Sequence, residues 1–152
     1  MPVAWRIVKK RHAATAFTGD GAAKTGGRWN SRGVPVVYAS ATLSLATLEI
    51  LVHLNPVVYF DYVAFRIEFD DALMTKLRPA ALPKDWRAEP PSPATQHLGD
   101  DWVRKSQSPI LAVPSGIVPL ETNYLINPNH PDYKKIKIAK PEPFRIDARL
   151  TR

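Results

Sequence analysis

The stretch between Arg32 and Asp61 limits most strongly how this chain can fold, because Glu49 is the only formally charged side chain within it. Its first part, VPVVYAS, has the apolar run of a buried strand, with Pro35 near the start. Its second part, SATLSLATLEILVHLN, is typical of a helix that is apolar on nearly all sides and therefore buried. Two buried elements need a core around them, so the stretch predicts a globular fold.

The rest of the chain predicts short strands around one or two helices. The central helix is expected to begin at Ser40, Thr42 or Ser44 and to end at Asn55-Pro56. We expect further strands at WRIVKK, VVYFDYVAFRIEF and SPILAVPS, and one or two in KIKIAKPEPFRID. The pattern indicates an α+β fold, with short antiparallel strands in one or two small sheets and helices at the periphery.

Three segments are expected to be irregular. AFTGDGAAKTGGRWNSRG is rich in glycine and is predicted to be a loop, and LETNYLINPNHPDY is predicted to be turn-rich. Much of the chain's proline, fifteen residues in all, lies in LRPAALPKDWRAEPPSPATQHLGDDW. We expect that segment to be an ordered surface excursion with a short helix around Gly99 to Lys105.

Composition narrows the class of protein. With 152 residues, 45% of them hydrophobic, the chain is expected to form one domain over residues 1–152. No apolar run reaches the ~18 residues of a membrane helix, and the N-terminus does not resemble a secretion signal. The absence of cysteine excludes disulfides and thiolate metal sites. A cytoplasmic location is therefore predicted.

The positive charge is concentrated near the N-terminus. The formal net charge is +7, and residues 1–60 carry seven Lys/Arg against two carboxylates, a net of +5. Such a region favours an anionic partner: a phosphorylated small molecule, a nucleic acid or an acidic protein. Charge alone is equally compatible with a role in solubility.

Glu49 is the first candidate for a functional residue. A carboxylate in apolar surroundings resists ionisation and must find a partner. The alternative is an ordinary glutamate on a narrow exposed stripe with Thr42 and His53. For an isolated glutamate that alternative is the more frequent one, and the neighbouring loop is what favours a functional role.

Three other residues could meet a ligand. Arg28 follows two glycines, which permit a sharp turn, and its planar fork suits phosphate or carboxylate. Tyr38 ends the predicted strand and could stack on a flat heterocycle. Ser115 lies on a tight turn after a buried strand and could hydrogen-bond a ligand. Each could instead be structural: a surface arginine, a core tyrosine or a turn serine.

Weaker signals complete the set. Trp29 is a substrate-binding candidate as the neighbour of Arg28, and Asn123 is one by its place in TNYLINP, although Asn123 and Asn127 are more typical of turns. The surroundings of Ser115, V-P-S-G-I, are not a nucleophile elbow, so serine hydrolysis is disfavoured. The histidines lack metal-ligand spacing, and no metal is assigned.

Taken in order, these pieces resemble the RES-domain toxins of bacterial toxin–antitoxin operons. That family is named for an arginine, a glutamate and a serine, which match Arg28, Glu49 and Ser115. The resemblance covers nearly the whole chain, through TGDGAAKTGGRWNSRGVPVVYAS, LATLEILVHL, GDDW, AVPSGIVPLETNYLINPNHP and FRIDARL. The length also matches a toxin without an appended domain.

The resemblance implies an ADP-ribosyltransferase-like fold and consumption of NAD+ as a substrate, with no other cofactor. It carries an Arg-Tyr-Glu catalytic set onto Arg28, Tyr38 and Glu49. It also implies an antitoxin with an Xre-like DNA-binding part and a toxin-binding part, through which any contact with DNA would occur.

The residue types suit that chemistry. Loss of nicotinamide leaves an oxocarbenium-like ribose, which one carboxylate can stabilise, and the neutral leaving group needs no acid. Arg28 would hold the pyrophosphate, Tyr38 would stack on nicotinamide, and Ser115 would orient ribose or the amide. Hydrolysis, phosphorolysis and transfer to a protein all remain open. A basic nucleic-acid-binding module is a more distant alternative, because the sequence lacks a helix-turn-helix, an RNP motif and a basic helix with spaced aromatics.

Overall fold

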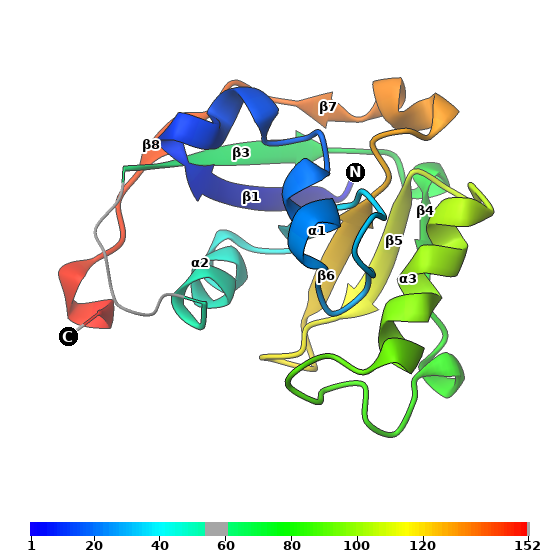
Figure 1. Ribbon diagram of the computed structural model, residues 1–152. Coiled ribbons are helices and arrows are strands. Elements are labelled where there is room, and N and C mark those ends of the chain that lie inside the picture. The colour runs from blue at the N-terminus through cyan, green and yellow to red at the C-terminus, as the bar shows by residue number, and fades with distance from the viewer. Residues whose placement is uncertain (54–60, 152) are drawn as a thin grey trace.

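A single mixed sheet organises the computed structural model, which describes residues 1–53 and 61–151 (Figure 1). The strand order is β4 (Met74–Lys76), β5 (Ile110–Pro114), β6 (Thr122–Ile126), β2 (Val37–Ser40), β1 (Val3–Lys9), β3 (Tyr62–Glu68) and β7 (Lys137–Ile138), and β8 (Glu142–Phe144) also pairs with β3. All pairs are antiparallel except β4 with β5. The α+β class is as predicted, but eight strands share one sheet and one pair is parallel.

The sheet has two arms that meet at a narrow joint. The first arm is formed by β1, β3, β7 and β8, and the second arm by β2, β6, β5 and β4. Strands β1 and β3 pair along their whole length, whereas β1 and β2 are joined at Trp5 and Ser40. In Figure 1, β1 and β3 run across the top of the view, and β5 and β6 run steeply beneath them. The helix α2 (Leu43–Leu51) lies beneath β1, in the angle between the two arms.

Each face of the second arm packs a separate core. Side chains alternate along a strand, so the paired residues Tyr38, Leu125 and Leu111 share one face, where a cluster with Trp29 and Trp102 is buried. The opposite face is packed by another cluster, which includes Val37, Ile110, Ile126, Ile67 and Phe69. The first of these faces also holds Asn123, which pairs with Ser40.

Helix α2 matches the predicted central helix at its start. The Thr42 side chain caps it by accepting a hydrogen bond from the Leu45 N–H at 3.0 Å. Leu45 and Ala46 are buried, but Leu48 and Val52 are exposed, so the expectation of burial on nearly all sides is wrong. The helix ends at Leu51; the predicted end at Asn55-Pro56 lies outside the described residues.

Helix α3 (Pro93–Arg104) begins earlier than the predicted Gly99. Pro93 does not break this helix, because it occupies the first turn, where a missing N–H costs nothing, and Ser92 caps the helix. Gly99 packs directly on the backbone of Trp29, since a Cβ there would collide with the Trp29 carbonyl oxygen. The helix therefore lies tightly against the loop that carries Arg28.

Two segments predicted to be irregular contain regular structure. The glycine-rich loop holds α1 (Asp20–Thr25), whose Ala22 and Ala23 favour helix, and which ends at Gly26 with a positive φ of 72°. The turn-rich segment holds β6, a central strand between β2 and β5. The polar residues of TNYLI made this segment look like a turn in the sequence. They are compatible with a strand because only alternate side chains enter each core.

Short 3-10 helices complete the described chain, and none of its helices is long and apolar enough to cross a membrane. They are η1 (Lys10–Thr15), η2 (Asp71–Leu73), η3 (Pro79–Ala81), η4 (Pro131–Lys135) and η5 (Ala148–Leu150). The predicted strands WRIVKK, VVYFDYVAFRIEF and SPILAVPS correspond to β1, β3 and β5, and the closing strands correspond to β7 and β8. Residues 57–60 of the second predicted strand lie outside the described residues.

Candidate active site

The Glu49 carboxylate is held by two side chains from the second arm of the sheet. Its Oε1 accepts a hydrogen bond from Ser115 Oγ at 3.0 Å and another from Asn123 Nδ2 at 2.7 Å. Both donors bind the same oxygen, and Oε2 has no hydrogen-bond partner in the part of the chain that the structure describes. The arrangement fixes the carboxylate and leaves one of its oxygens available.

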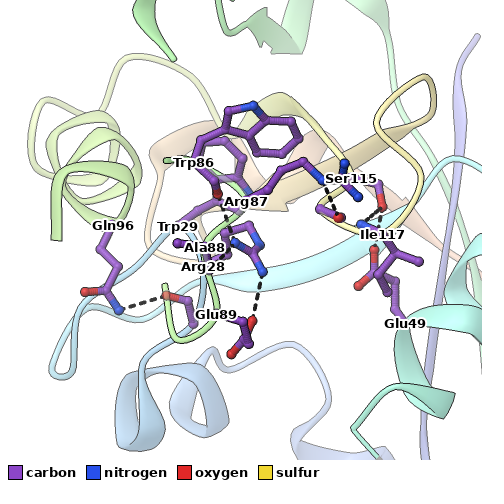
Figure 2. Close-up of polar contacts among 12 residues, drawn as sticks. Arg28, Trp29, Glu49, Trp86, Arg87, Ala88, Glu89, Gln96, Ser115 and Ile117 are labelled. Atoms are coloured by element: carbon purple, nitrogen blue, oxygen red, sulfur yellow. Dashed lines mark hydrogen bonds and ion pairs between the residues drawn. The ribbon is translucent and has the colours of Figure 1, made fainter. Parts of the chain in front are cut away.

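Ser115 is fully buried at the end of β5. Its Oγ accepts from the backbone N–H groups of Ile117 and Val118, both at 3.1 Å, so its single proton is donated to Glu49. Figure 2 shows this hydroxyl directed at the carboxylate. In this structure the hydroxyl of Ser115 makes three hydrogen bonds within the protein, and its predicted contact with a ligand stays a prediction.

Asn123 lies on β6, not in the turn that its sequence context predicted, because β6 completes the sheet between β2 and β5. A carboxylate can only accept, so the amide nitrogen must face Glu49 and Oδ1 must face away. That Oδ1 is buried and has no hydrogen-bond partner among the described residues. Among the described residues, Glu49 is the one hydrogen-bond partner of the Asn123 side chain. Asn127 does lie in a turn, where its Oδ1 accepts from the Asn129 N–H at 3.0 Å.

The Arg28 side chain reaches the turn that contains Ser115 and Gly116. A Cβ at Gly116 would lie 2.6 Å from Arg28 Nε, so only glycine allows this approach next to Ser115. The terminal nitrogens face residues 86–89: Nη1 donates to the carbonyls of Trp86 and Ala88, and Nη2 pairs with Glu89, each at 2.9 Å. Figure 2 shows Arg28 between this segment and the Ser115 turn.

Tyr38 and Trp29 support the loop that carries Arg28. Tyr38 Oη donates to Asn30 Oδ1 at 2.5 Å and accepts from the Trp29 N–H at 3.1 Å. Burial raises the pKa of Tyr38 far above its usual range, so the hydroxyl stays protonated and remains a donor. The Trp29 ring is 2% exposed and packs on Trp86 with centroids 6.1 Å apart, which makes it a core residue.

Sequence reasoning missed the residues of α3 that hold this loop. Asp100 accepts from the N–H of Ser31 at 2.9 Å and from its hydroxyl at 2.6 Å, and Gln96 donates to the Gly27 carbonyl at 2.9 Å. The motif GDDW contained the signal, since a Gly-Asp pair on a helix face suggests close backbone packing with a hydrogen-bonding side chain beside it. Without the partner loop, no pattern identified which aspartate is buried.

This constellation can stabilise positive charge. Glu49 presents one oriented oxygen from a largely apolar helix, where an ion or hydroxyl interacts with it more strongly than in water. Neither donor to Glu49 is an acid that could protonate a leaving group. The geometry therefore suits a reaction that develops a cation and releases a neutral group.

Known proteins resemble this chain over nearly its full length. A family model described as RES domain matches residues 3–147. "Toxin Res" of Yersinia enterocolitica is 37% identical over 148 residues, which cover 96% of this chain and 97% of that protein. "Toxin Res" of Pseudomonas putida is 38% identical over 151 residues, covering 97% and 99%.

Two further similarities concern fold and chemistry. The "Prs ADP-ribosylating toxin" of Sphingobium sp. strain YBL2 is 40% identical over 154 residues, covering 97% of this chain and 96% of that protein. A solved structure, the MbcT–MbcA toxin–antitoxin complex of M. tuberculosis, matches with a TM-score of 0.73 at 15% identity, over 94% of this chain and 84% of that one. The shared fold confirms the predicted α+β class.

Proposed function

This chain belongs to the RES-domain family of toxins, and on that premise we propose that it breaks the bond between nicotinamide and ribose in NAD+. Draining NAD+ would arrest the growth of its host. In this proposal NAD+ is a substrate and not a resident cofactor.

The observation that carries the proposal is the geometry of Glu49. Departure of nicotinamide leaves positive charge on the ribose ring, and a carboxylate beside the anomeric carbon stabilises it. Ser115 and Asn123 hold Oε1, so Oε2 would face the ribose. Nicotinamide leaves as a neutral base, which explains why one carboxylate suffices.

The remaining candidate residues take supporting roles. Ser115 and Asn123 act as positioning residues for Glu49, because their donors are bound to its oxygen. Tyr38 holds the loop of Arg28 through its hydroxyl, and its ring remains our candidate for stacking on nicotinamide. Arg28 lines the same turn as Ser115 and would lie near the substrate's phosphates.

A second candidate reaction is transfer of ADP-ribose to a protein. It begins with the same bond cleavage and differs in the acceptor: water, phosphate or a protein side chain. The name of the Sphingobium relative, "Prs ADP-ribosylating toxin", favours transfer, and its 40% identity makes this alternative worth a direct test.

The test is incubation of the purified chain with NAD+, with and without phosphate, followed by mass identification of the products. Free ADP-ribose would indicate hydrolysis, and ADP-ribose 1″-phosphate would indicate phosphorolysis. Glu49→Gln, which keeps the size of the side chain, is the control. Absence of nicotinamide release with the wild-type chain, in buffer and in host lysate, would contradict the proposal.

The partner in this proposal is an antitoxin that covers the entrance of the site. The net charge of +5 on residues 1–60 would attract an acidic antitoxin surface. The solved structure that shares this fold, MbcT–MbcA, is a toxin–antitoxin complex, which supports a partner of this kind. Antitoxin affinity should fall when a non-cleavable NAD+ analogue is bound; simultaneous binding at undiminished affinity would contradict a covered entrance.

A further inference from the structure

We propose that Arg87 binds the diphosphate of the dinucleotide, and that Arg28, predicted above to do so, instead positions Arg87. This inference rests on the proposed NAD+ site and adds a residue to it. Arg87 lies in the proline-rich segment between η3 and α3, which the sequence predicted to be a surface excursion.

Arg87 is attached to the turn that orients Glu49. Its Nε donates to the Gly116 carbonyl at 3.0 Å, and Gly116 follows the serine that bonds Glu49. Figure 2 shows the Arg87 side chain extending from its own segment toward the Ser115 turn. Its two terminal nitrogens have no acceptor within residues 1–53 and 61–151. The Nη1 and Nη2 groups of Arg87 can therefore donate side by side to a ligand next to the candidate active site.

The backbone on both sides of Arg87 is held by Arg28. The carbonyls of Trp86 and Ala88, the residues before and after it, both accept from Arg28 Nη1 at 2.9 Å. The Trp86 ring also packs on Trp29. These contacts fix the backbone around Arg87 and leave the terminal donors of its exposed side chain unused, and with the bond from Nε to Gly116 they favour preorganisation for binding.

Arg28 is poorly suited to the role assigned to it from the sequence. Both hydrogens of its Nη1 are used by the two carbonyls, and Nη2 is paired with the Glu89 carboxylate. Glu89 neutralises its charge locally, so Arg28 presents little net charge to an anion. Arg87 has no such carboxylate partner among the described residues, and its charge remains available.

The chemistry of the diphosphate fits this fork. A diphosphate presents pairs of negatively charged oxygens, and a guanidinium binds two of them at once in plane. Glu49 would repel an approaching dianion, and the Arg87 cation bound to the Gly116 carbonyl would offset that repulsion and direct the ribose end toward Oε2.

The test compares substrates that differ only in their phosphates. With NAD+, Arg87→Ala should raise KM about tenfold or more while kcat changes little, because one charge-assisted contact to the substrate is lost. With nicotinamide riboside, which has no phosphate, wild type and variant should have equal kcat/KM. Lys84→Ala, which removes the same charge from an exposed position of the same segment, should leave both substrates unaffected. An unchanged KM for NAD+, or an equal loss with both substrates, would overturn the proposal.

The role of Arg28 is tested by a double-mutant cycle. Arg28→Lys cannot hold both carbonyls and Glu89, so it should raise the KM for NAD+ by releasing Arg87. In the Arg87→Ala background the same change should add little, because the two residues act through one contact. Full additivity of the two KM effects would show that Arg28 acts on its own and would refute its positioning role.

A binding measurement separates this inference from the proposed reaction. Calorimetric titration with ADP needs no turnover: wild type and Lys84→Ala should bind, and Arg87→Ala should bind about tenfold more weakly or worse. If wild type binds ADP through Arg87 but releases no nicotinamide, the proposed reaction fails and the site stands. If wild type does not bind ADP, or Arg87→Ala binds it equally well, the Arg87 assignment is wrong.

Discussion

Glu49 and Asp100 are both helical carboxylates that accept a hydrogen bond from a serine, yet the two are used differently. Asp100 is 7% exposed, and each of its oxygens accepts a bond from Ser31, one from the N–H and one from the hydroxyl. Glu49 receives both of its bonds on one oxygen. Asp100 therefore uses both of its oxygens to join two segments, whereas Glu49 keeps one oxygen without a partner among the described residues, as our proposal requires of a carboxylate that serves a ligand.

The surroundings of the two carboxylates reinforce the comparison. Asp100 faces a loop held also by Gln96 and by the close approach of Gly99, and it is almost fully buried although it lines a surface pocket. Glu49 is only partly buried and lies on a short helix whose residues Ser44 and Leu48 are exposed. The first carboxylate is expected to affect stability, and the second to affect activity.

The largest expected effect is loss of activity in Glu49→Gln. The variant keeps the size of the side chain but not its charge, and removal of such an electrostatic group costs on the order of a hundredfold or more in rate. Nicotinamide release measures the rate, and thermal unfolding should show a melting temperature close to that of wild type. Full activity in this variant would remove Glu49 from the mechanism.

Asp100→Asn should have the opposite profile. Its amide nitrogen can donate to the Ser31 hydroxyl, but both contacts then lose the carboxylate charge and the hydroxyl proton loses its acceptor, which costs about 1–3 kcal/mol of unfolding free energy. Urea unfolding measures the loss. The comparison would fail if this variant unfolded like wild type while Glu49→Gln was the destabilised one.

Ser115→Ala should combine both effects at smaller size. It removes one of two donors to Glu49 and leaves the N–H groups of Ile117 and Val118 without their acceptor. We expect kcat to fall about tenfold, consistent with one net hydrogen bond, with KM little changed. Ser44→Ala, at an exposed position of α2, is the matched control. A large rise in KM would instead show that Ser115 contacts the substrate directly.

Tyr38→Phe tests the loop that Asp100 also holds. Loss of the hydroxyl leaves Asn30 Oδ1 and the Trp29 N–H without a partner, so the unfolding free energy should fall by about 1–2 kcal/mol. The ring remains, so stacking on nicotinamide is preserved and the KM for NAD+ should be nearly unchanged. Steady-state kinetics at a temperature where the variant is fully folded separates the two effects.

Glu89→Gln should have the smallest effect. Its side chain is 69% exposed and pairs with Arg28 at the surface, where such ion pairs contribute about 0–1 kcal/mol. The unfolding free energy should change by no more than that, because the two backbone carbonyls continue to hold Arg28. A loss as large as that of Asp100→Asn would place Glu89 among the buried structural carboxylates.

Several elements were predictable because their signals are local. The apolar run and three candidate caps, of which the structure uses Thr42, identified α2, and apolar segments of strand length identified β1, β3 and β5. Strand β6 was missed because half of its residues are polar, and its place in the sheet depends on pairing with β2 and β5. The start of α3 was missed because Pro93 acts as a first-turn residue, which only a cap at Ser92 reveals.

The sequence by itself determined the kinds of residue available to the site: one carboxylate in an apolar helix, an arginine beside glycines and a serine after a strand. Tertiary structure alone decided which of their atoms remain free. Glu49 meets its two donors across 66 and 74 residues of chain, and Arg28 meets its carbonyl acceptors across 58 and 60. Hydrogen bonds form only between groups that lie within about 3 Å of each other, and periodicity along a chain does not encode that proximity between distant segments. For that reason the sequence pointed to Arg28 as the anion-binding residue, and the folded structure left Arg87 with the free donors.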